Sequence, residues 1–220
     1  MHIRHSPFLA SDEDFPPAAL AGQAAISSSF AGARHTALPF PYLALTDMLP
    51  PGLARALVQL PFAQPAEPVL GRPRPIPQAR GDIGMREVDS FSACRTVVAS
   101  FQAPDVIAAM TRASGADLRG CGAQITLVRE VDGYTCAPRT GCAEARLTLM
   151  VALDTGNQIA LGPDIYFETG DWACQIPWRP GCGVAFAPSP RSWHGFEPRM
   201  IRALRTSLIV DYAPDTCRNG

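Results

Sequence analysis

The sequence predicts a mainly β fold, a barrel or double-sheet jelly roll with two or three helices packed outside one sheet. Short strand-like segments separated by turn dipeptides fill the chain from residue 123 onward. No parallel strand-helix-strand rhythm with a glycine-rich phosphate loop is present, which argues against a doubly wound α/β fold. The remaining segments support a small number of helices.

Each element has its own sequence signal. A strand over 40–45 is followed by a helix over 53–60 after Pro50-Pro51. A second helix over 104–114 begins at Pro104, which suits a first turn, and ends at Gly115. The later strands, separated by Asp-Gly, Thr-Gly and Pro-Gly turns, are expected at 123–130, 145–153, 164–167, 173–177, 183–187 and 204–212.

The length of 220 residues suits one domain with an N-terminal elaboration. Residues 1–36 mix serine, alanine and glycine without a strong apolar period, so we expect a flexible N-terminal arm. Residues 37–220 then form the jelly-roll domain. The proline-rich segment Pro61–Arg80 can sustain neither a helix nor a central strand, and is expected to be a loop or an extended edge.

Charge and composition exclude several function classes. The chain is 47% hydrophobic and has a net charge of -1. Because of this low net charge, no charge excess is available to hold nucleic acid or an anionic membrane. All 19 basic residues are arginine, which excludes a Schiff-base lysine and a phosphate-loop lysine.

The seven cysteines are an odd number and contain no Cys-x-x-Cys pair, so we interpret them as reduced thiols. The N-terminal segment follows Asp12, Glu13 and Asp14 rather than a basic region, unlike a signal peptide, and is too weakly apolar to span a bilayer. We therefore expect a cytoplasmic protein.

The segment 180–212 contains the clearest candidates for chemistry. On its last strand, Arg205 and Ser207 share one face because side chains alternate, and together they can hold a carboxylate. His194, the one histidine after His35, stands in the loop before that strand. The alternative interpretation is a surface salt bridge for Arg205 and a structural imidazole for His194.

Residues 39–212 resemble the 2-oxoglutarate- and Fe(II)-dependent oxygenase superfamily, in the branch of prolyl hydroxylases and their bacterial relatives. The similarity lies in the order of PFPYLALTDMLPPGLARAL, ITLVREVDGY, RLTLMVAL, LGPDIY, PGCGVAF, WHGFEPR and LRTSLIVDY. The resemblance implies a double-stranded β-helix that holds Fe(II) through a His-x-Asp pair and a later histidine. It also implies a basic residue on the last strand that binds 2-oxoglutarate.

Under this resemblance, His194 corresponds to the later iron-binding histidine and Arg205 to the residue that binds 2-oxoglutarate, with Ser207 beside it. The His-x-Asp pair would fall at Arg139-Thr140-Gly141, so both of these ligands are missing. A guanidinium has no lone pair for iron, and its charge opposes a nearby cation. We therefore do not expect Fe(II) to be held in the family's usual way.

Three alternatives follow from this substitution. Cys136 and Cys142 bracket the altered motif and can join His194 in a zinc-type site. His35 can instead swing in from the N-terminal arm. Finally, Arg139 and Arg205 can present two positive charges across one cavity and bind a small dianion, 2-oxoglutarate itself among the candidates, without metal.

The sequence thus predicts a non-catalytic or atypical oxygenase-like protein that binds a small anion or a partner protein. The alternative is an active 2-oxoglutarate-dependent Fe(II) dioxygenase that hydroxylates a peptide, sugar or small metabolite. Substrate, partner and oligomeric state have no signal in the sequence.

Other polar and aromatic residues have two interpretations each. The tryptophans can line a substrate cleft or pack in the core, and Asp164 can contact substrate or stabilise a turn. Glu197 and Arg199 are expected to shape the loop after His194.

Overall fold

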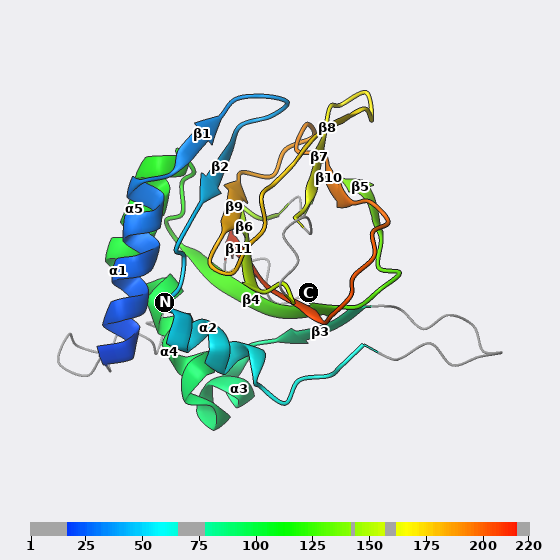
Figure 1. Ribbon diagram of the computed structural model, residues 1–220. Coiled ribbons are helices and arrows are strands. Elements are labelled where there is room, and N and C mark those ends of the chain that lie inside the picture. Colours follow the sequence, from blue (N-terminus) through cyan, green and yellow to red (C-terminus); the bar gives the residue numbers. More distant parts are fainter. Residues whose placement is uncertain (1–16, 66–77, 142–143, 157–161, 215–220) are drawn as a thin grey trace, which may run out of the picture.

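Two antiparallel sheets face each other in a jelly roll. The computed structural model describes residues 17–65, 78–141, 144–156 and 162–214. The large sheet has the strand order β1-β2-β9-β6-β11-β4-β3, and the small sheet has the order β5-β10-β7-β8. Figure 1 shows the small sheet opposite the large one, with the helices on the other side of the large sheet, at the left and lower left of the view. The mainly β jelly roll expected from the sequence is confirmed.

The bounds of the strands follow the expected segments closely in the second half of the chain. The large sheet consists of β1 (Arg34–Thr36), β2 (Tyr42–Leu45), β3 (Gln78–Asp82), β4 (Cys121–Glu130), β6 (Leu147–Asp154), β9 (Gly183–Phe186) and β11 (Arg205–Pro214). The small sheet consists of β5 (Cys136–Arg139), β7 (Asp164–Tyr166), β8 (Trp172–Gln175) and β10 (His194–Phe196). All strand pairs are antiparallel, and β3 forms the edge beside β4.

The described residues form five helices, whereas two or three were expected: α1 (Pro17–Ala31), α2 (Pro51–Val58), α3 (Met85–Ser90), α4 (Ser92–Gln102) and α5 (Pro104–Ser114). Helix α5 has the predicted bounds, and Gly115 ends it in a left-handed conformation with φ 73°. Helix α4 escaped prediction because Thr96, Val97 and Val98 are β-branched and disfavour helix. Burial of Val97 and Phe101 compensates for that propensity.

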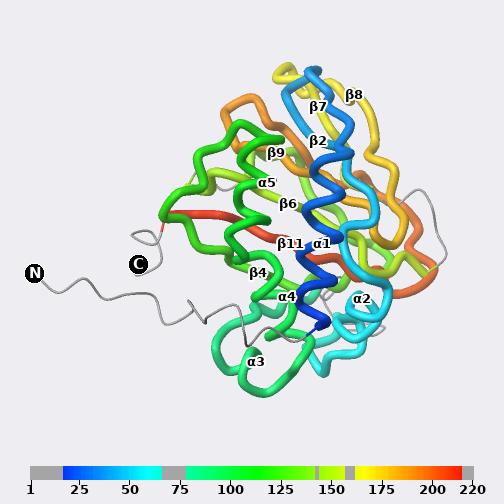
Figure 2. Tube along the Cα trace, turned by 90° about the vertical axis from the view of Figure 1, so that its left-hand side faces the viewer, coloured from blue at the N-terminus to red at the C-terminus, as the bar shows by residue number. Residues whose placement is uncertain are grey.

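Helices α1, α4 and α5 cover the outer face of the large sheet, as Figure 2 shows. The expectation of a loosely attached arm over 1–36 is therefore wrong for residues 17–36, which form α1 and β1; residues 1–16 lie outside the described part. Ile26 and Phe30 of α1 are buried in the main core. The small residues that concealed this helix in the sequence are what let it pack closely, with Gly22 against Ser100 of α4.

The apolar side chains form two cores, one on each face of the large sheet. The larger core lies between the sheet and the helices and includes Leu208, Val210 and Tyr212 of β11. The smaller core lies between the two sheets and includes Trp178, Phe186 and Phe196. The Tyr212 hydroxyl also donates a 2.6 Å hydrogen bond to the Phe101 carbonyl at the end of α4. Strand β11 therefore ties the helix layer to the sheet.

Two further expectations concern segments around these elements. Of Pro61–Arg80, residues 66–77 lie outside the described part, and residues 78–82 form the edge strand β3, in agreement with an extended edge. In the described part of the chain, no helix is both long enough and apolar enough to cross a membrane.

Substitution of Gly22 by alanine tests the docking of α1. An added Cβ would lie 2.3 Å from Ser100 Oγ, so Gly22→Ala should lower the free energy of unfolding by about 1–3 kcal/mol. Gly52→Ala in α2 is the matched control, because an added Cβ there meets nothing within 4 Å. Urea denaturation measures both variants. Equal midpoints for the two variants would contradict close packing of α1.

Candidate functional site

A cavity that contains buried polar groups opens between the two sheets on the inner face of β11. Its deep part has a volume of about 50 Å³ and is lined by Glu130 of β4, Trp178, Phe196 of β10, and Arg205 and Ser207 of β11. Arg205 and Ser207 therefore share one face and one cavity, as the alternation along the strand predicted.

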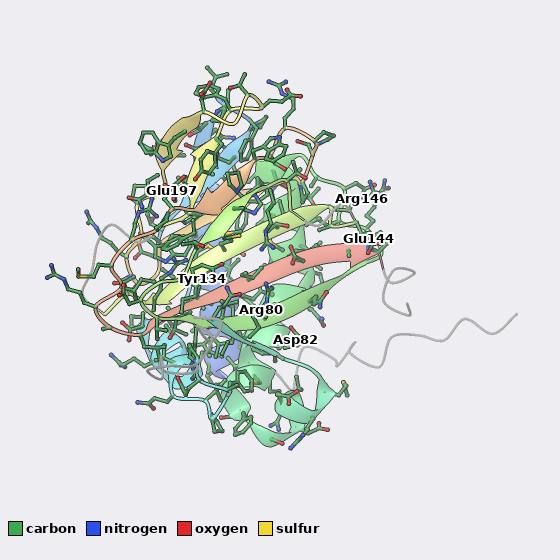
Figure 3. The ribbon with its side chains drawn as sticks, turned by 90° about the vertical axis from the view of Figure 1, so that its right-hand side faces the viewer. Arg80, Asp82, Tyr134, Glu144, Arg146 and Glu197 are labelled. Carbon is green, nitrogen blue, oxygen red and sulfur yellow. The ribbon has the colours of Figure 1, made fainter. Side chains whose placement is uncertain are left out.

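A second cavity of about 270 Å³ continues from the first toward solvent. Arg80, Arg139, Met150, His194 and Ile209 line both cavities, so the two form one trough. Figure 3 views the molecule from the side of β3 and β5, with Arg80 and Tyr134 of the trough near the centre of that view. We call the two parts the inner cavity and the outer cavity.

The Arg205 guanidinium lies at the inner end and is only 6% exposed. Its Nε is 3.1 Å from Glu130 Oε2, and Gln78 Nε2 donates to Glu130 Oε1 at 3.0 Å. The guanidinium also lies over the rings of Phe196, at 4.4 Å, and Trp178, at 5.5 Å. Burial lowers the pKa of Arg205, and the Glu130 carboxylate opposes that shift. The salt bridge considered for Arg205 does form, but it is buried rather than on the surface.

Several polar atoms of the inner cavity have no hydrogen-bond partner among the described residues. They are Arg205 Nη1, Ser207 Oγ, Trp178 Nε1 and Glu130 Oε2, the last because its contact with Arg205 is not aligned as a hydrogen bond. All four side chains are buried and line the inner cavity. Buried polar atoms are nearly always hydrogen-bonded in folded proteins, so the inner cavity is suited to a polar ligand or ordered water.

His194 lies in β10 between Arg139 of β5 and Ile165 of β7. Its Nδ1 is 2.9 Å from the Ser192 carbonyl, which can only accept, so Nδ1 carries the proton and Nε2 keeps the lone pair. The ring packs on Phe186 with 4.9 Å between centroids. Burial lowers the pKa of His194, and the charge of Arg139 lowers it further, so the imidazole is neutral at pH 7.

The two positions expected to correspond to iron ligands do lie beside His194. Arg139 is its cross-strand partner, and a Cβ added to Gly141 would lie 3.3 Å from His194 Cε1. Neither position offers a metal ligand. Among the described residues, no group of three or more His, Cys, Asp and Glu side chains could hold a metal ion. An Fe(II) site requires several N and O ligands, and of these three positions His194 is the one that supplies such a ligand.

The other proposed ligands have different outcomes. Cys136 lines the inner cavity, whereas Cys142 lies outside the described residues, so the zinc-type site stays a prediction. The idea of His35 swinging in is wrong, because His35 is fixed in β1 opposite Leu43 and lines a separate groove.

The outer cavity carries charged groups that the sequence analysis did not single out. Asp211 accepts a 2.5 Å hydrogen bond from Thr148, and burial raises its pKa. Arg80 lies on the edge strand β3 and faces the same cavity. Asp211 is an even number of residues away from Arg205 and Ser207 in β11. The alternation of side chains along the strand therefore predicts that it lies on the same face. The positions of Arg80 and Glu130 in the site depend on the register between strands, and the sequence around each residue gives no signal for that register.

Asp164 has a structural role. Its carboxylate is fully buried and accepts hydrogen bonds from Arg199 Nη2, from Trp172 Nε1 at 3.0 Å and from the Glu197 amide at 2.8 Å. Arg199 thus pairs with Asp164 rather than with Glu197, which instead accepts from the Tyr166 hydroxyl. These contacts hold the loop after His194 in place, as expected, and occupy the Asp164 carboxylate.

The three tryptophans differ in their surroundings. Trp178 is completely buried and lines the inner cavity, so it belongs both to the core and to the candidate site. Trp172 is 56% exposed and bonds to Asp164, and Trp193 lies half-buried in the turn before His194.

The similarities to known proteins are structural. No protein-family model matches the chain, and no curated protein matches it either. A prolyl-4-hydroxylase from Pseudomonas putida matches with a TM-score of 0.56 at 17% identity, over 87% of this chain and 98% of that one. A prolyl 4-hydroxylase from Phytophthora capsici gives 0.57 at 14%, over 93% and 68%. HygX from Streptomyces hygroscopicus, solved with nickel and 2-oxoglutarate, gives 0.53 at 10%, over 79% and 83%. At these identities the matches show a shared fold, which is the double-stranded β-helix expected from the resemblance.

The pH dependence of stability tests the buried, neutral state of His194. The unfolded chain protonates this imidazole near pH 6.5, whereas the folded protein does so only at lower pH. Between these values the unfolded state binds more protons, so stability falls as the pH falls, by up to about 1.4 kcal/mol for each pH unit.

We expect the free energy of unfolding, measured by urea denaturation from pH 7.5 to 5, to fall more steeply for the wild type than for His194→Gln. His35→Gln should give a curve parallel to the wild type, because His35 is exposed. If the curve of His194→Gln were also parallel to that of the wild type, the His194 imidazole would not be a neutral buried group.

Proposed function

We propose that this protein is a non-catalytic member of the oxygenase fold that binds a small anion without Fe(II). The single observation that carries the proposal is the pair of positions flanking His194, which hold an arginine and a glycine. A guanidinium has no lone pair to donate and repels a cation. His194 alone provides too few ligands for a divalent metal.

The backbone at Gly141 supports the same conclusion. Its φ of 89° is a left-handed conformation that a residue with a side chain adopts only with strain. A carboxylate placed there would also press on the His194 ring, because its Cβ alone would lie 3.3 Å from Cε1. The local structure is therefore adapted to glycine rather than to a metal-binding carboxylate.

The outer cavity is suited to an anion. Arg80 and Arg139 both line it, and neither forms an ion pair with a described carboxylate. Asp211, the carboxylate of this cavity, accepts a hydrogen bond from Thr148 and offsets part of the charge of these two arginines. Two guanidinium groups near a neutral imidazole can bind a carboxylate or phosphate through charge-assisted hydrogen bonds. The charge of Arg205 is balanced by Glu130, so Arg205 contributes less than Arg80 and Arg139 to the attraction of an anion.

The second candidate function is an active 2-oxoglutarate-dependent Fe(II) dioxygenase whose missing ligands come from elsewhere in the chain or from a partner. The fold shared with prolyl 4-hydroxylases favours it, as does the common cavity of His194, Arg205 and Ser207. In this case Arg205 and Ser207 would bind 2-oxoglutarate, and a peptide, sugar or small metabolite would be the substrate.

Anaerobic titration with Fe(II) and 2-oxoglutarate separates the two candidates. We expect no visible metal-to-ligand charge-transfer band and no stoichiometric endpoint. A band with a sharp endpoint that disappears in His194→Gln would overturn the proposal in favour of the active enzyme. A signal that persists in His194→Gln would come from metal bound outside the site and would leave the proposal standing.

Anion binding is tested by calorimetric titration of metal-free protein with small dicarboxylates and phosphate. Arg139→Ala and Arg80→Ala should each weaken binding by about tenfold, since each removes a charged hydrogen-bond donor. Arg119→Ala is the matched control, because Arg119 lies on the surface paired with Asp117. No heat at millimolar ligand, or equal losses in all three variants, would contradict an anion site in the trough.

A further inference from the structure

The inner end of the trough, formed by the residues that line the inner cavity alone, has no net charge, because its two charged side chains are Arg205 and Glu130. The Arg205 guanidinium already faces the Glu130 carboxylate, and Gln78 fixes that carboxylate from the neighbouring strand. A ligand carboxylate brought to Arg205 would therefore meet Glu130 across the same guanidinium, in a buried place where like charges repel strongly. The inner cavity disfavours a second carboxylate.

The polar atoms of the inner cavity that lack a hydrogen-bond partner include both donors and acceptors. Arg205 Nη1 and Trp178 Nε1 can only donate, whereas Glu130 Oε2 can only accept. Ser207 Oγ can do either. A carboxylate ligand would satisfy the donors but offer no hydrogen to Glu130 Oε2, which has an ion pair with Arg205 but no aligned hydrogen bond. A carboxamide has a carbonyl oxygen for the donors and an amide nitrogen for Glu130, and so matches the complete set.

The inner cavity has aromatic rings in its lining that a flat, uncharged group can contact. The rings of Trp178 and Phe196 flank the guanidinium at 5.5 Å and 4.4 Å. Planar amides pack well against such surfaces, and their transfer from water costs much less than that of an ion.

The middle part of the trough has the opposite preference, because Arg80 and Arg139 line both cavities and neither forms an ion pair with a described carboxylate. Asp211 lines the outer cavity alone. The trough is therefore polarised along its length, with two guanidinium groups in its middle part and a neutral inner end that both donates and accepts hydrogen bonds.

We propose that the ligand of this trough is a monoanion with a carboxylate at one end and a carboxamide or similar uncharged polar group at the other, rather than a dicarboxylate. This inference rests on the proposed anion binding and specifies its ligand class. The carboxylate lies toward Arg80 and Arg139, and the amide lies between Trp178, Ser207 and the Arg205–Glu130 pair.

The test compares acids with their half-amides on metal-free protein. Calorimetric titrations use succinate, glutarate and adipate beside succinamate, glutaramate and adipamate, so that length and amide content vary separately. We expect the best half-amide to bind at least about tenfold more tightly than the diacid of equal length.

Glu130→Gln is the diagnostic variant, since it removes the charge of Glu130 at nearly constant shape and leaves Arg205 with its own charge. It should reverse the preference, so that the diacid binds more tightly than the half-amide. Asp211→Asn is the matched control, because Asp211 lies in the outer cavity. It should strengthen both ligands by a similar factor and leave their ratio unchanged.

The outcomes separate the two proposals. A diacid that binds as tightly as its half-amide, with Arg139→Ala still weakening both, overturns the half-amide inference and leaves anion binding intact. If no ligand binds, both proposals fail together. Should Glu130→Gln not fold, as judged by circular dichroism, the ratio measured on the wild type decides by itself.

Discussion

The buried contact between Arg205 and Glu130 determines how the space between the two sheets is used. These residues are cross-strand partners of β11 and β4, and Gln78 of β3 is the partner of Glu130 on its other side. Three adjacent strands thus bring a cation, an anion and an amide into one row. Removing either charge would leave the other buried and uncompensated, which is far costlier than keeping both. A polar cavity in this position follows from that pairing.

The apolar layer on the opposite face makes such a polar interior tolerable. Leu208, Val210 and Tyr212 of β11 pack against the helices together with Phe30 and Phe101. Burial of apolar surface there supplies most of the favourable folding free energy, so the inner face does not need to be wholly apolar. The same arrangement explains why α1 is an integral part of the fold, because without it the outer face of α4 and α5 would be exposed.

Sequence reasoning succeeded where a local pattern determines the structure. Pro104 and Gly115 mark the ends of α5, and the alternation along β11 places Arg205 and Ser207 together. It failed for α1, whose alanines, serines and glycines have no strong apolar period although their small size permits close helix packing. Short strands such as β5 and β10 also escaped, since three or four residues carry too little pattern. The neighbours of Arg205 depend on register between distant strands, and no residue near it in sequence indicates Glu130.

The two faces of β11 have different roles, and this affects which sequence changes such a protein can tolerate. Even-numbered residues from 208 to 212 face the helices, and odd-numbered residues from 205 to 211 face the trough. A one-residue deletion in this strand would exchange the two sets and place a guanidinium in the main core. Single substitutions at the odd positions, in contrast, leave the helix layer untouched. The scaffold can therefore acquire or lose a chemistry through point changes while it keeps its architecture, which makes the shape of this fold a poor guide to the reaction that any one chain performs.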